Sequence, residues 1–366
     1  MTRVTATPEW EAAFRGLPRA AFLPDLIWPF DADSGTAAAV NRRTDPDAWQ
    51  AAARSDAPIV TQWDDGAHDG EAPGETPTSS ASAPPLVAAM LADLDVCPGM
   101  RVLEIGTGTG WNAALLAHRL GDDNVVTVEV DPEVAADARR ALAKAGRRPL
   151  VVTGDGALGV PDGAPYDRVI ATCGMRRIPA EWLRQLRPGG VILAPWGTSY
   201  SSHDALVRLT VRPDGSASGP FRRLLEFMKL RAHRFVWPSY PDDLSVWDRT
   251  VSGAPPPHDP WLSFTFVAGL CLRDAAHAVQ QHDDGHTLWL YSLGDDSWTA
   301  AVHRAGTGPG TVVRQAGPRR LWDELVAAYA WWTAHGEPTI DRFGLTVTPD
   351  GTTPWLDDPG RPVPAV

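Results

Sequence analysis

The sequence feature that most constrains the fold is a glycine-rich turn between an apolar stretch and a segment typical of a helix. Residues 101–105 read RVLEI, residues 106–110 read GTGTG, and residues 111–120 read WNAALLAHRL. Glycines at alternate positions let the chain turn sharply and let a ligand lie against bare backbone, while the following helix offers unpaired N–H groups. The segment therefore predicts a strand, a ligand-binding turn and a helix in direct succession.

The sequence around this turn alternates between two patterns. PPLVAAMLADLDV, DPEVAADARRALAKAG and IPAEWLRQL are typical of helices, whereas NVVTVEV, PLVVTG, YDRVIATC and GGVILAPW are typical of buried strands. Strands that alternate with helices of this length form a parallel sheet through right-handed crossovers, with helices on both faces. We therefore predict an α/β fold, a doubly wound Rossmann-like sheet, over residues 65–215.

The flanking segments follow other patterns. Residues 1–64 mix short apolar runs with prolines, and we expect them to pack on the central domain. Residues 64–82 are polar and acidic and predict a loop. Within residues 216–366, SFTFVAGLCL, HTLWLYSL and SWTAAVHR predict strands, RRLWDELVAAYAWWTAH predicts a helix, and GLTVTPDGTTPWL predicts a hairpin. We predict an α+β C-terminal domain, for which peptide recognition is one candidate role and core filling by its tryptophans the other.

Composition disfavours several classes of function. The 33 Lys and Arg against 45 Asp and Glu give a net charge of -12, which disfavours nucleic acid as a partner. No apolar run approaches the ~20 residues that span a bilayer, and the first residues lack a signal-peptide pattern, so a cytoplasmic protein without a membrane partner is expected. The three cysteines are far apart and form no CxxC, and HDDGH at 282–286 is more typical of a polar turn than of a metal site. No metal is expected.

Two acidic residues follow strands of the predicted sheet. Glu129 lies near the end of VTVEV, and Asp155 lies in GDG after the next strand. At the carboxyl edge of the sheet they are suited to the ribose hydroxyls and the exocyclic amine of an adenosine. Trp111 stands where a dinucleotide fingerprint has its third glycine, so the spacing favours S-adenosylmethionine over a dinucleotide. Each acidic residue alone is also a common helix cap or turn former, but their joint occurrence favours a nucleoside site.

Five segments in this order and spacing resemble the protein-L-isoaspartate O-methyltransferase family of class I methyltransferases: VLEIGTGTGWNAALLA, VEVDP, GDG, APYDRVIATC and LRPGGVILAPWG. Upstream, AFRGLPRAAFLPDLIW resembles the family's Pro-Arg-x-x-Phe-x-Pro element, and SSASAPPLVAAM resembles its Thr-x-Ser-x-Pro segment. The resemblance covers roughly residues 13–215. It implies catalytic serines at Ser82 and Ser80, which would hold a substrate carboxylate. It also implies a site for S-adenosylmethionine, with S-adenosylhomocysteine as product, formed by Glu104, Gly106, Gly108, Gly110, Glu129, Asp155 and Gly156.

Some features depart from the family's usual pattern. The loop before the serines is long and acidic, Arg176 and Arg177 follow the fourth strand, and about 150 residues follow the predicted domain. TQWDD, TSSAS, ATCGMRRIP and the extension resemble the actinobacterial branch associated with ribosomally made modified peptides such as lanthipeptides. This implies esterification of an aspartate in a modified precursor peptide, followed by cyclisation to aspartimide. Repair of isoaspartyl damage is the alternative. Arg176 and Arg177 are candidate substrate-binding residues, with a solvated turn as the alternative.

The predicted serines are suited to a carboxylate as the group that accepts the methyl. Its pKa lies near ~4, so it is ionised at neutral pH and needs no general base. Hydroxyl groups such as those of the two serines can orient it for in-line displacement. A third alternative is a cofactor-binding module without catalysis, against which the intact glycine turn and serine pair argue. Trp111 and Trp196 are predicted either to wall the pocket or to fill the core. The oligomeric state is not predicted.

Overall fold

The computed structural model describes the chain outside five short gaps, that is, residues 6–31, 35–245, 247–253, 255–304 and 310–366. The chain divides into two compact units. The first comprises Met1–Cys173, Pro179–Ala194 and Arg208–Ala217, and the second comprises Gly174–Ile178, Pro195–Val207 and Ser218–Val366. The predicted domain boundaries at residues 64 and 215 remain a prediction.

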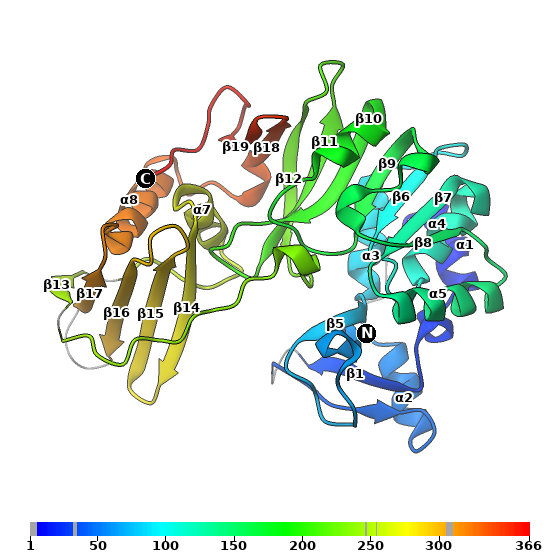
Figure 1. Ribbon diagram of the computed structural model, residues 1–366, viewed down its shortest axis with the longest axis horizontal. Helices are drawn as coiled ribbons and strands as arrows, with labels where there is room; N and C mark the ends of the chain where they lie inside the picture. Colours follow the sequence, from blue (N-terminus) through cyan, green and yellow to red (C-terminus); the bar gives the residue numbers. More distant parts are fainter. Residues whose placement is uncertain (1–5, 32–34, 246, 254, 305–309) are drawn as a thin grey trace. The chain divides into compact units, whose positions relative to one another are not determined.

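A parallel sheet forms the centre of the first unit (Figure 1). The parallel strands of the sheet have the order β10-β9-β6-β7-β8. The strand order reverses at β6 and β9, and in doubly wound sheets ligands bind at the carboxyl ends of the strands beside such a switch point. The strands are β6 (Val102–Ile105), β7 (Val125–Glu129), β8 (Leu150–Thr153), β9 (Tyr166–Ala171) and β10 (Leu186–Trp196), of which the first unit contains β10 as far as Ala194. The predicted α/β sheet is confirmed.

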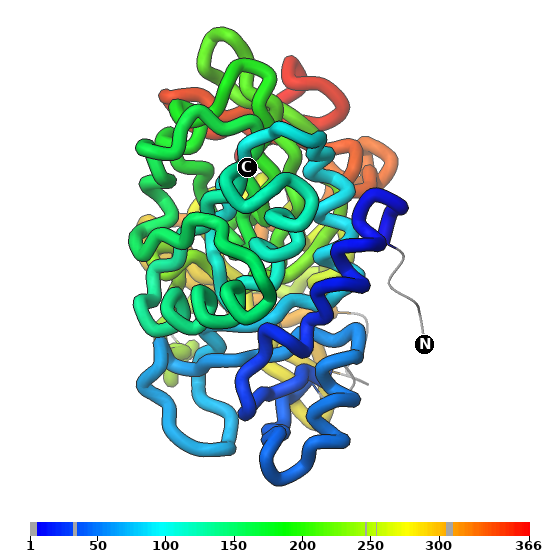
Figure 2. The backbone as a smooth tube through the Cα atoms, turned by 90° about the vertical axis from the view of Figure 1, so that its right-hand side faces the viewer, coloured from blue at the N-terminus to red at the C-terminus, as the bar shows by residue number. Residues whose placement is uncertain are grey.

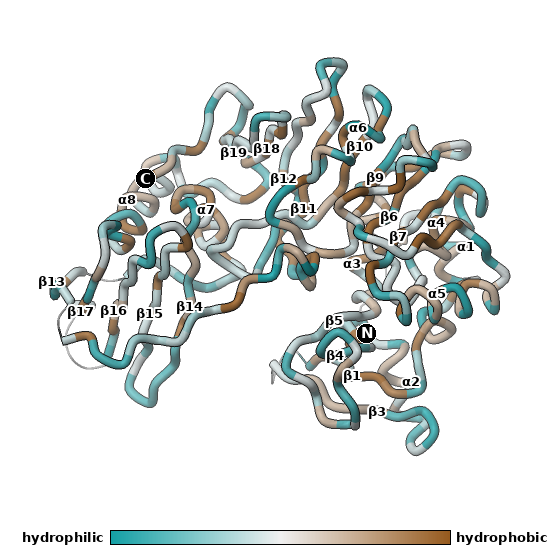
Figure 3. Tube along the Cα trace, viewed as in Figure 1, coloured by the Kyte–Doolittle hydropathy of each residue, from teal (hydrophilic) through white to brown (hydrophobic). Residues whose placement is uncertain are grey.

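The helices of this sheet begin and end where local chemistry dictates. α5 starts at a proline, and its cap Asp131 accepts hydrogen bonds from the backbone N–H groups of Glu133 and Val134. Most of α4 is buried, because seven of its ten residues are apolar, including the unbroken run from Ala113 to Ala117. Figure 3 shows β6, β7 and β9 as largely hydrophobic stretches of the trace. The helices are α3 (Pro84–Leu94), α4 (Trp111–Leu120), α5 (Pro132–Lys144) and α6 (Ala180–Gln185).

The N-terminal residues form a small antiparallel sheet that the sequence did not specify. Its order is β2-β1-β4-β5, and β3 also pairs with β1. Leu23, Ile27, Trp49, Ala53, Ile59 and Ala81 form its buried core. The elements are α1 (Pro8–Gly16), β1 (Leu26–Asp31), β2 (Thr36–Ala37), β3 (Val40–Asn41), α2 (Pro46–Ala53), β4 (Ile59–Trp63) and β5 (Pro77–Ala81). α1 packs against α4, and in Figure 2 this stretch is the dark blue trace beside the cyan and green trace of the parallel sheet.

The prediction of a loop over residues 64–82 is wrong at its end, where β5 is a strand paired with β4. The three central residues of β5, Thr78, Ser79 and Ser80, are polar, so hydrophobic alternation could not reveal the strand. Their hydroxyls bond across the pair instead: Thr61 Oγ1 donates to Ser79 Oγ over 3.1 Å, and Thr78 Oγ1 donates to Gln62 Oε1 over 2.8 Å.

The second unit contains a five-stranded antiparallel sheet of order β13-β17-β16-β15-β14. The predicted strands at β15 and β16, the helix at α8 and the hairpin of β18 and β19 are confirmed. The elements are β13 (Asp248–Ser252), α7 (Ser263–Cys271), β14 (Ala275–His282), β15 (Gly285–Ser292), β16 (Trp298–Arg304), β17 (Thr311–Ala316), α8 (Leu321–Ala334), β18 (Phe343–Thr348) and β19 (Gly351–Leu356); β11 (Asp204–Val211) and β12 (Ala217–Leu225) contain residues of both units.

SFTFVAGLCL is helix α7 and not the predicted strand. Every residue of α7 after Ser263 is buried, so the helix shows no polar face and therefore no helical period in its sequence. In the described part of the chain, no helix combines the length and the apolar character needed to cross a membrane.

Candidate active site

The glycine turn lies at the carboxyl end of β6, where the sequence predicted it. Gly106, Gly108 and Gly110 all have positive φ, at 90°, 52° and 84°. The Gly106 N–H donates to the carbonyl of Val128 over 2.9 Å, which ties the turn to the neighbouring strand β7. The turn therefore presents backbone, and no side chain of its own, at these three positions.

Glu129 is the last residue of β7 and holds this turn in place. Its Oε2 accepts a hydrogen bond from the Gly108 N–H over 2.9 Å, and its Oε1 accepts one from the Asp131 N–H over 3.1 Å. An ionised carboxylate has about four lone-pair sites, so both oxygens retain capacity to accept further hydrogen bonds. The next residue, Val130, is apolar and 41% exposed.

Asp155 and Gly156 follow β8 at the same edge. Asp155 Oδ1 accepts a hydrogen bond from the Ala157 N–H over 2.9 Å, so this carboxylate also caps a short turn. Gly156 packs against β6, because a Cβ there would lie 2.6 Å from Cγ2 of Ile105. Leu158 is 59% exposed. Two exposed apolar side chains, those of Leu158 and Val130, therefore follow the two edge carboxylates, which suits the faces of an aromatic base.

Glu104 lies beneath the turn and is fully buried. Its carboxylate accepts hydrogen bonds from Thr127 Oγ1 over 2.6 Å and from Asn112 Nδ2 over 2.7 Å. Because the Thr127 hydroxyl donates to Glu104, it accepts from Thr107 Oγ1, 2.7 Å away. Burial raises the pKa of Glu104 to about 7. The network connects β6, β7, the turn and α4.

Asn112, Thr127 and Thr107 were not among the predicted site residues. Two signals could have indicated them. Thr127 is a polar residue inside the otherwise apolar strand VVTVE, and Asn112 is a polar residue in the first turn of a helix whose following residues are apolar. A buried carboxylate needs donors, and these positions face it from neighbouring elements.

The predicted catalytic serines lie at the end of β5 and just beyond it. A Cβ on Gly108 would lie 3.5 Å from the backbone oxygen of Ser80 and 4.0 Å from the hydroxyl of Ser79, so the end of β5 lies over the glycine turn. Ser80 and Ser82 are half-buried. The structure thus brings the serine strand and the predicted cofactor turn together, although they are far apart in the sequence.

Arg176 and Arg177 belong to the second unit. The Arg176 Nε donates to the carbonyl of His233 over 3.0 Å, and its Nη1 donates to the carbonyl of Thr198. Burial lowers the pKa of Arg176 from its ordinary value. Arg177 is exposed. Substrate binding by either arginine stays a prediction.

The alternatives for three other features are resolved. Trp111 and Trp196 are 4% and 5% exposed and fill cores, with Trp111 Nε1 bonded to the carbonyl of Leu17 over 2.8 Å. HDDGH forms the turn of the β14–β15 hairpin, in which His282 pairs with Gly285. Within the described ranges, no cluster of three or more His, Cys, Asp or Glu side chains is arranged to hold a metal ion.

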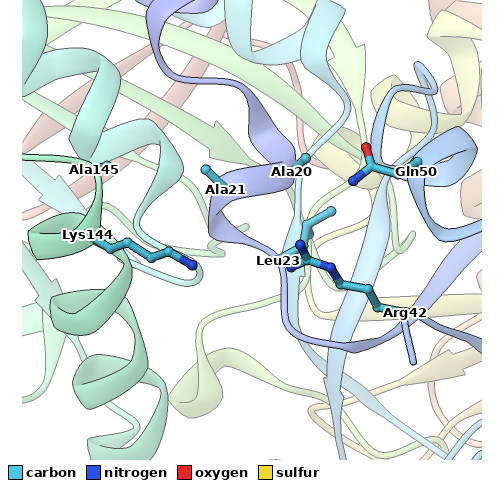
Figure 4. A pocket seen from close by; sticks show the side chains of 7 residues that line it. All are labelled: Ala20, Ala21, Leu23, Arg42, Gln50, Lys144 and Ala145. Carbon is cyan, nitrogen blue, oxygen red and sulfur yellow. The ribbon is translucent and has the colours of Figure 1, made fainter. Parts of the chain in front are cut away.

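A pocket of about 330 Å³ lies elsewhere in the first unit (Figure 4). Lys144, the last residue of α5, points toward it, as do Arg42 and Gln50. α5 begins beside the carboxyl edge of the sheet, and its 13 residues span roughly 20 Å at ~1.5 Å per residue. The pocket therefore lies at the opposite end of α5 from the candidate site. None of the predicted site residues lines it; the lining residues are Ala20, Ala21, Leu23, Arg42, Gln50, Lys144 and Ala145.

The reversed strand order, the glycine turn and the edge carboxylates define a Rossmann-like domain of the class I methyltransferase type. Comparison with known proteins narrows this class. Residues 56–230 match the family described as Protein-L-isoaspartate(D-aspartate) O-methyltransferase. This part of the chain is therefore similar to the protein-L-isoaspartate O-methyltransferase family, which supports the predicted resemblance; the branch associated with modified peptides is not shown.

Two relatives named protein-L-isoaspartate O-methyltransferase illustrate the similarity. The protein of Pyrococcus horikoshii is 46% identical over 136 residues, and that of Thermococcus onnurineus is 45% identical over 137 residues. Each alignment covers 37% of this chain and 61% of the relative, so the chain spans about three fifths of the length of these relatives.

A solved structure with the same name extends the likeness in fold. It is 21% identical with a TM-score of 0.54, and the alignment covers 96% of this chain and 96% of that chain. At this identity the likeness concerns the fold alone. The likeness in fold extends over nearly the whole of both chains, including most of the residues after the predicted domain.

Proposed function

We propose that the chain is an S-adenosylmethionine-dependent carboxyl O-methyltransferase that esterifies isoaspartyl residues in peptides. The observation that carries this proposal is the position of the Ser80 backbone over Gly108, which joins a hydroxyl-rich strand to a glycine turn flanked by two carboxylates. The family match over residues 56–230 and the names of the relatives support the substrate class.

The donor set at the sheet edge fits the cofactor. Glu129 is suited to the ribose hydroxyls and Asp155 to the adenine amine, with Val130 and Leu158 against the faces of the base. The backbone of Gly106, Gly108 and Gly110 forms the turn, and a Cβ at any of the three would lie within 3.5 Å of another protein atom. Glu104 and Gly156 hold the turn and the strand ends that form the site. When bound, the cofactor supplies a methyl group on a positively charged sulfur.

The serines act on the acceptor. An isoaspartyl carboxylate is ionised at neutral pH and is itself the nucleophile, so no residue has to remove a proton from it. Hydrogen bonds from Ser82 and Ser80 orient one of its oxygens and leave the other available for in-line attack. Because hydroxyl donors are neutral, they hold the carboxylate without the strong pairing that would lower its nucleophilicity. Arg176 and Arg177 are proposed to contact the peptide around it.

A second candidate substrate is an aspartate in a modified precursor peptide. The long acidic segment before β5 and the Arg176–Arg177 pair favour it, since both depart from the family's usual sequence. In this case the methyl ester would be attacked by the next backbone nitrogen, methanol would leave, and an aspartimide would remain. The C-terminal unit is proposed to recognise the peptide in this case.

One incubation separates the two candidates. The purified protein and S-adenosylmethionine are mixed with matched peptides that carry either an isoaspartyl or an aspartyl residue, and the products are weighed by mass spectrometry. Efficient gain of one methyl group by the isoaspartyl peptide supports the first candidate. Loss of one water from the aspartyl peptide, with no turnover of the isoaspartyl peptide, supports the second. A protein that binds S-adenosylhomocysteine and modifies neither peptide is a binding module.

A further inference from the structure

Arg19 is a buried arginine whose side chain is bonded entirely to backbone. It is 4% exposed, and all five N–H groups of its guanidinium donate to carbonyl oxygens. The acceptors are the carbonyls of Ala52, Ala53, Ser55, Ala57 and Ser82, at 2.8–3.2 Å. A planar fork of five donors is what only arginine offers.

Four of these bonds explain how the buried charge is tolerated. The carbonyls of Ala52 and Ala53 lie at the C-terminal end of α2, and those of Ser55 and Ala57 lie in the following turn. The last carbonyls of a helix lack intrahelical partners and carry partial negative charge. Burial lowers the pKa of Arg19 to about 10, so the side chain remains charged at neutral pH.

The fifth bond leads to the candidate site. Arg19 Nη1 donates to the carbonyl of Ser82 over 3.2 Å, across 63 positions of sequence. Ser82 lies between the end of β5 at Ala81 and the start of α3 at Pro84, outside the hydrogen-bond ladders of both. The guanidinium therefore fastens the backbone of the serine that the family resemblance assigns to catalysis.

We infer that Arg19 is a positioning residue for methyl transfer, acting through the backbone of Ser82 to place its hydroxyl against the acceptor carboxylate. The inference rests on the proposed function. Displacement of an orienting group by about 1 Å can cost roughly 100-fold in rate, so a bond to its backbone matters even without contact to the substrate. Arg19 is part of the Pro-Arg-x-x-Phe-x-Pro element, and the inference gives this arginine a role in the site.

Arg168 provides a matched control. It is 8% exposed, and its guanidinium also donates to three backbone carbonyls, those of Leu94, Asp95 and Asp167, at 2.9–3.0 Å. Two of these carbonyls lie at the far end of α3 from Ser82. Arg168 thus matches Arg19 in burial and in backbone bonding, but not in its connection to the serine.

The test compares Arg19→Lys with Arg168→Lys. Lysine keeps the charge but cannot span five separated carbonyls. Both variants are expected to lower the melting temperature. Only Arg19→Lys is expected to lower kcat for an isoaspartyl peptide, by about 10- to 100-fold, with KM and calorimetric affinity for S-adenosylhomocysteine nearly unchanged. In Arg19→Lys combined with Ser82→Ala, the rate should be close to that of Ser82→Ala alone, because the positioned hydroxyl is already absent.

A second variant leaves Arg19 in place and tests the same inference if Arg19→Lys does not fold. Replacing Ala83 by lactic acid turns the Ser82 carbonyl into an ester carbonyl, a weaker acceptor, and keeps the four bonds to the α2 segment. Its kcat should fall several-fold at unchanged melting temperature. Three outcomes would overturn the inference and leave the proposed function standing. They are equal losses of kcat in Arg19→Lys and Arg168→Lys, fully additive losses of activation free energy in Arg19→Lys combined with Ser82→Ala, and a normal kcat in the ester variant. A wild-type protein that methylates neither an isoaspartyl nor an aspartyl peptide would overturn the proposed function as well.

Discussion

At the scale of single residues, the site separates into groups that bind cofactor and groups that orient the acceptor. Ser82→Ala is expected to lower kcat by about 100-fold and to leave S-adenosylhomocysteine affinity nearly unchanged, because Ser82 would touch only the acceptor. Glu129→Ala is expected to weaken S-adenosylhomocysteine binding by about 10- to 100-fold, since it removes charge-assisted hydrogen bonds and the acceptor of the Gly108 N–H. Calorimetry and initial rates measure both. An equal loss of affinity in the two variants would show that the roles are assigned wrongly.

Glu104 gives the protein a pH dependence whose sign follows from its burial. Its pKa rises from 4.5 to about 7, so between these values the folded state binds more protons than the unfolded state. Its contribution to the free energy of unfolding is therefore complete below pH 4.5, declines as the pH rises to about 7, and is lost above that value. The decline is on the order of 3 kcal/mol at most.

Chemical denaturation of the wild type and of Glu104→Gln between pH 5 and 8 measures this effect. The wild type should lose stability across the range from this carboxyl group, and the amide should flatten the curve because it does not titrate. Equal slopes for the two proteins would mean that Glu104 keeps an ordinary pKa in the folded state.

Several residues were predictable because the chemistry they serve is local in sequence. Three glycines with positive φ and a carboxylate at the end of the next strand form a pattern that strand–turn–helix geometry places without further information. Arg19 was not predictable in this way. Its five acceptors come from two distant segments, and nothing in the local sequence indicates that its guanidinium is buried.

At the scale of elements, the close approach of β6 to the turn after β8 requires a glycine. A Cβ on Gly156 would lie 2.6 Å from Ile105, so Gly156→Ala should lower the free energy of unfolding by about 1–3 kcal/mol and weaken cofactor binding by shifting Asp155. Gly154→Ala is the matched control, because nothing lies within 4 Å of its added Cβ. In Gly156→Ala combined with Ile105→Ala, the losses should be less than additive. Additive losses would contradict a clash between these two positions.

Elements were predictable from sequence where burial is one-sided or regular. The parallel strands and α8 follow that rule, whereas α7 is buried on all sides and lacks the helical period. The prediction missed β5 for the opposite reason. This strand is held to β4 by hydroxyl hydrogen bonds, which a hydrophobic pattern does not reveal. The strand that carries Ser80 and ends one residue before Ser82 is thus the element at the site that the sequence pattern indicated least.

At the scale of the whole molecule, charge should select among peptides. The net charge is -12, and Asp65, Asp69, Glu71 and Glu75 are exposed in the connection between β4 and β5, directly before the serines. The electrostatic field of these negative charges attracts cationic peptides. Basic isoaspartyl peptides should therefore have a kcat/KM about 10-fold higher than acidic peptides of the same core sequence at low ionic strength.

Measuring kcat/KM at low and at high salt concentration tests whether this preference is electrostatic. At 1 M salt the screening length falls to about 3 Å, so the ratio of kcat/KM for the basic and acidic peptides should approach one, while an uncharged peptide should show little change. The double variant Asp69→Asn and Glu71→Gln should reduce the ratio at low salt without altering turnover of the uncharged peptide. A ratio that persists at high salt would place peptide selection in specific contacts, and the exposed Arg177 is then the first side chain to replace.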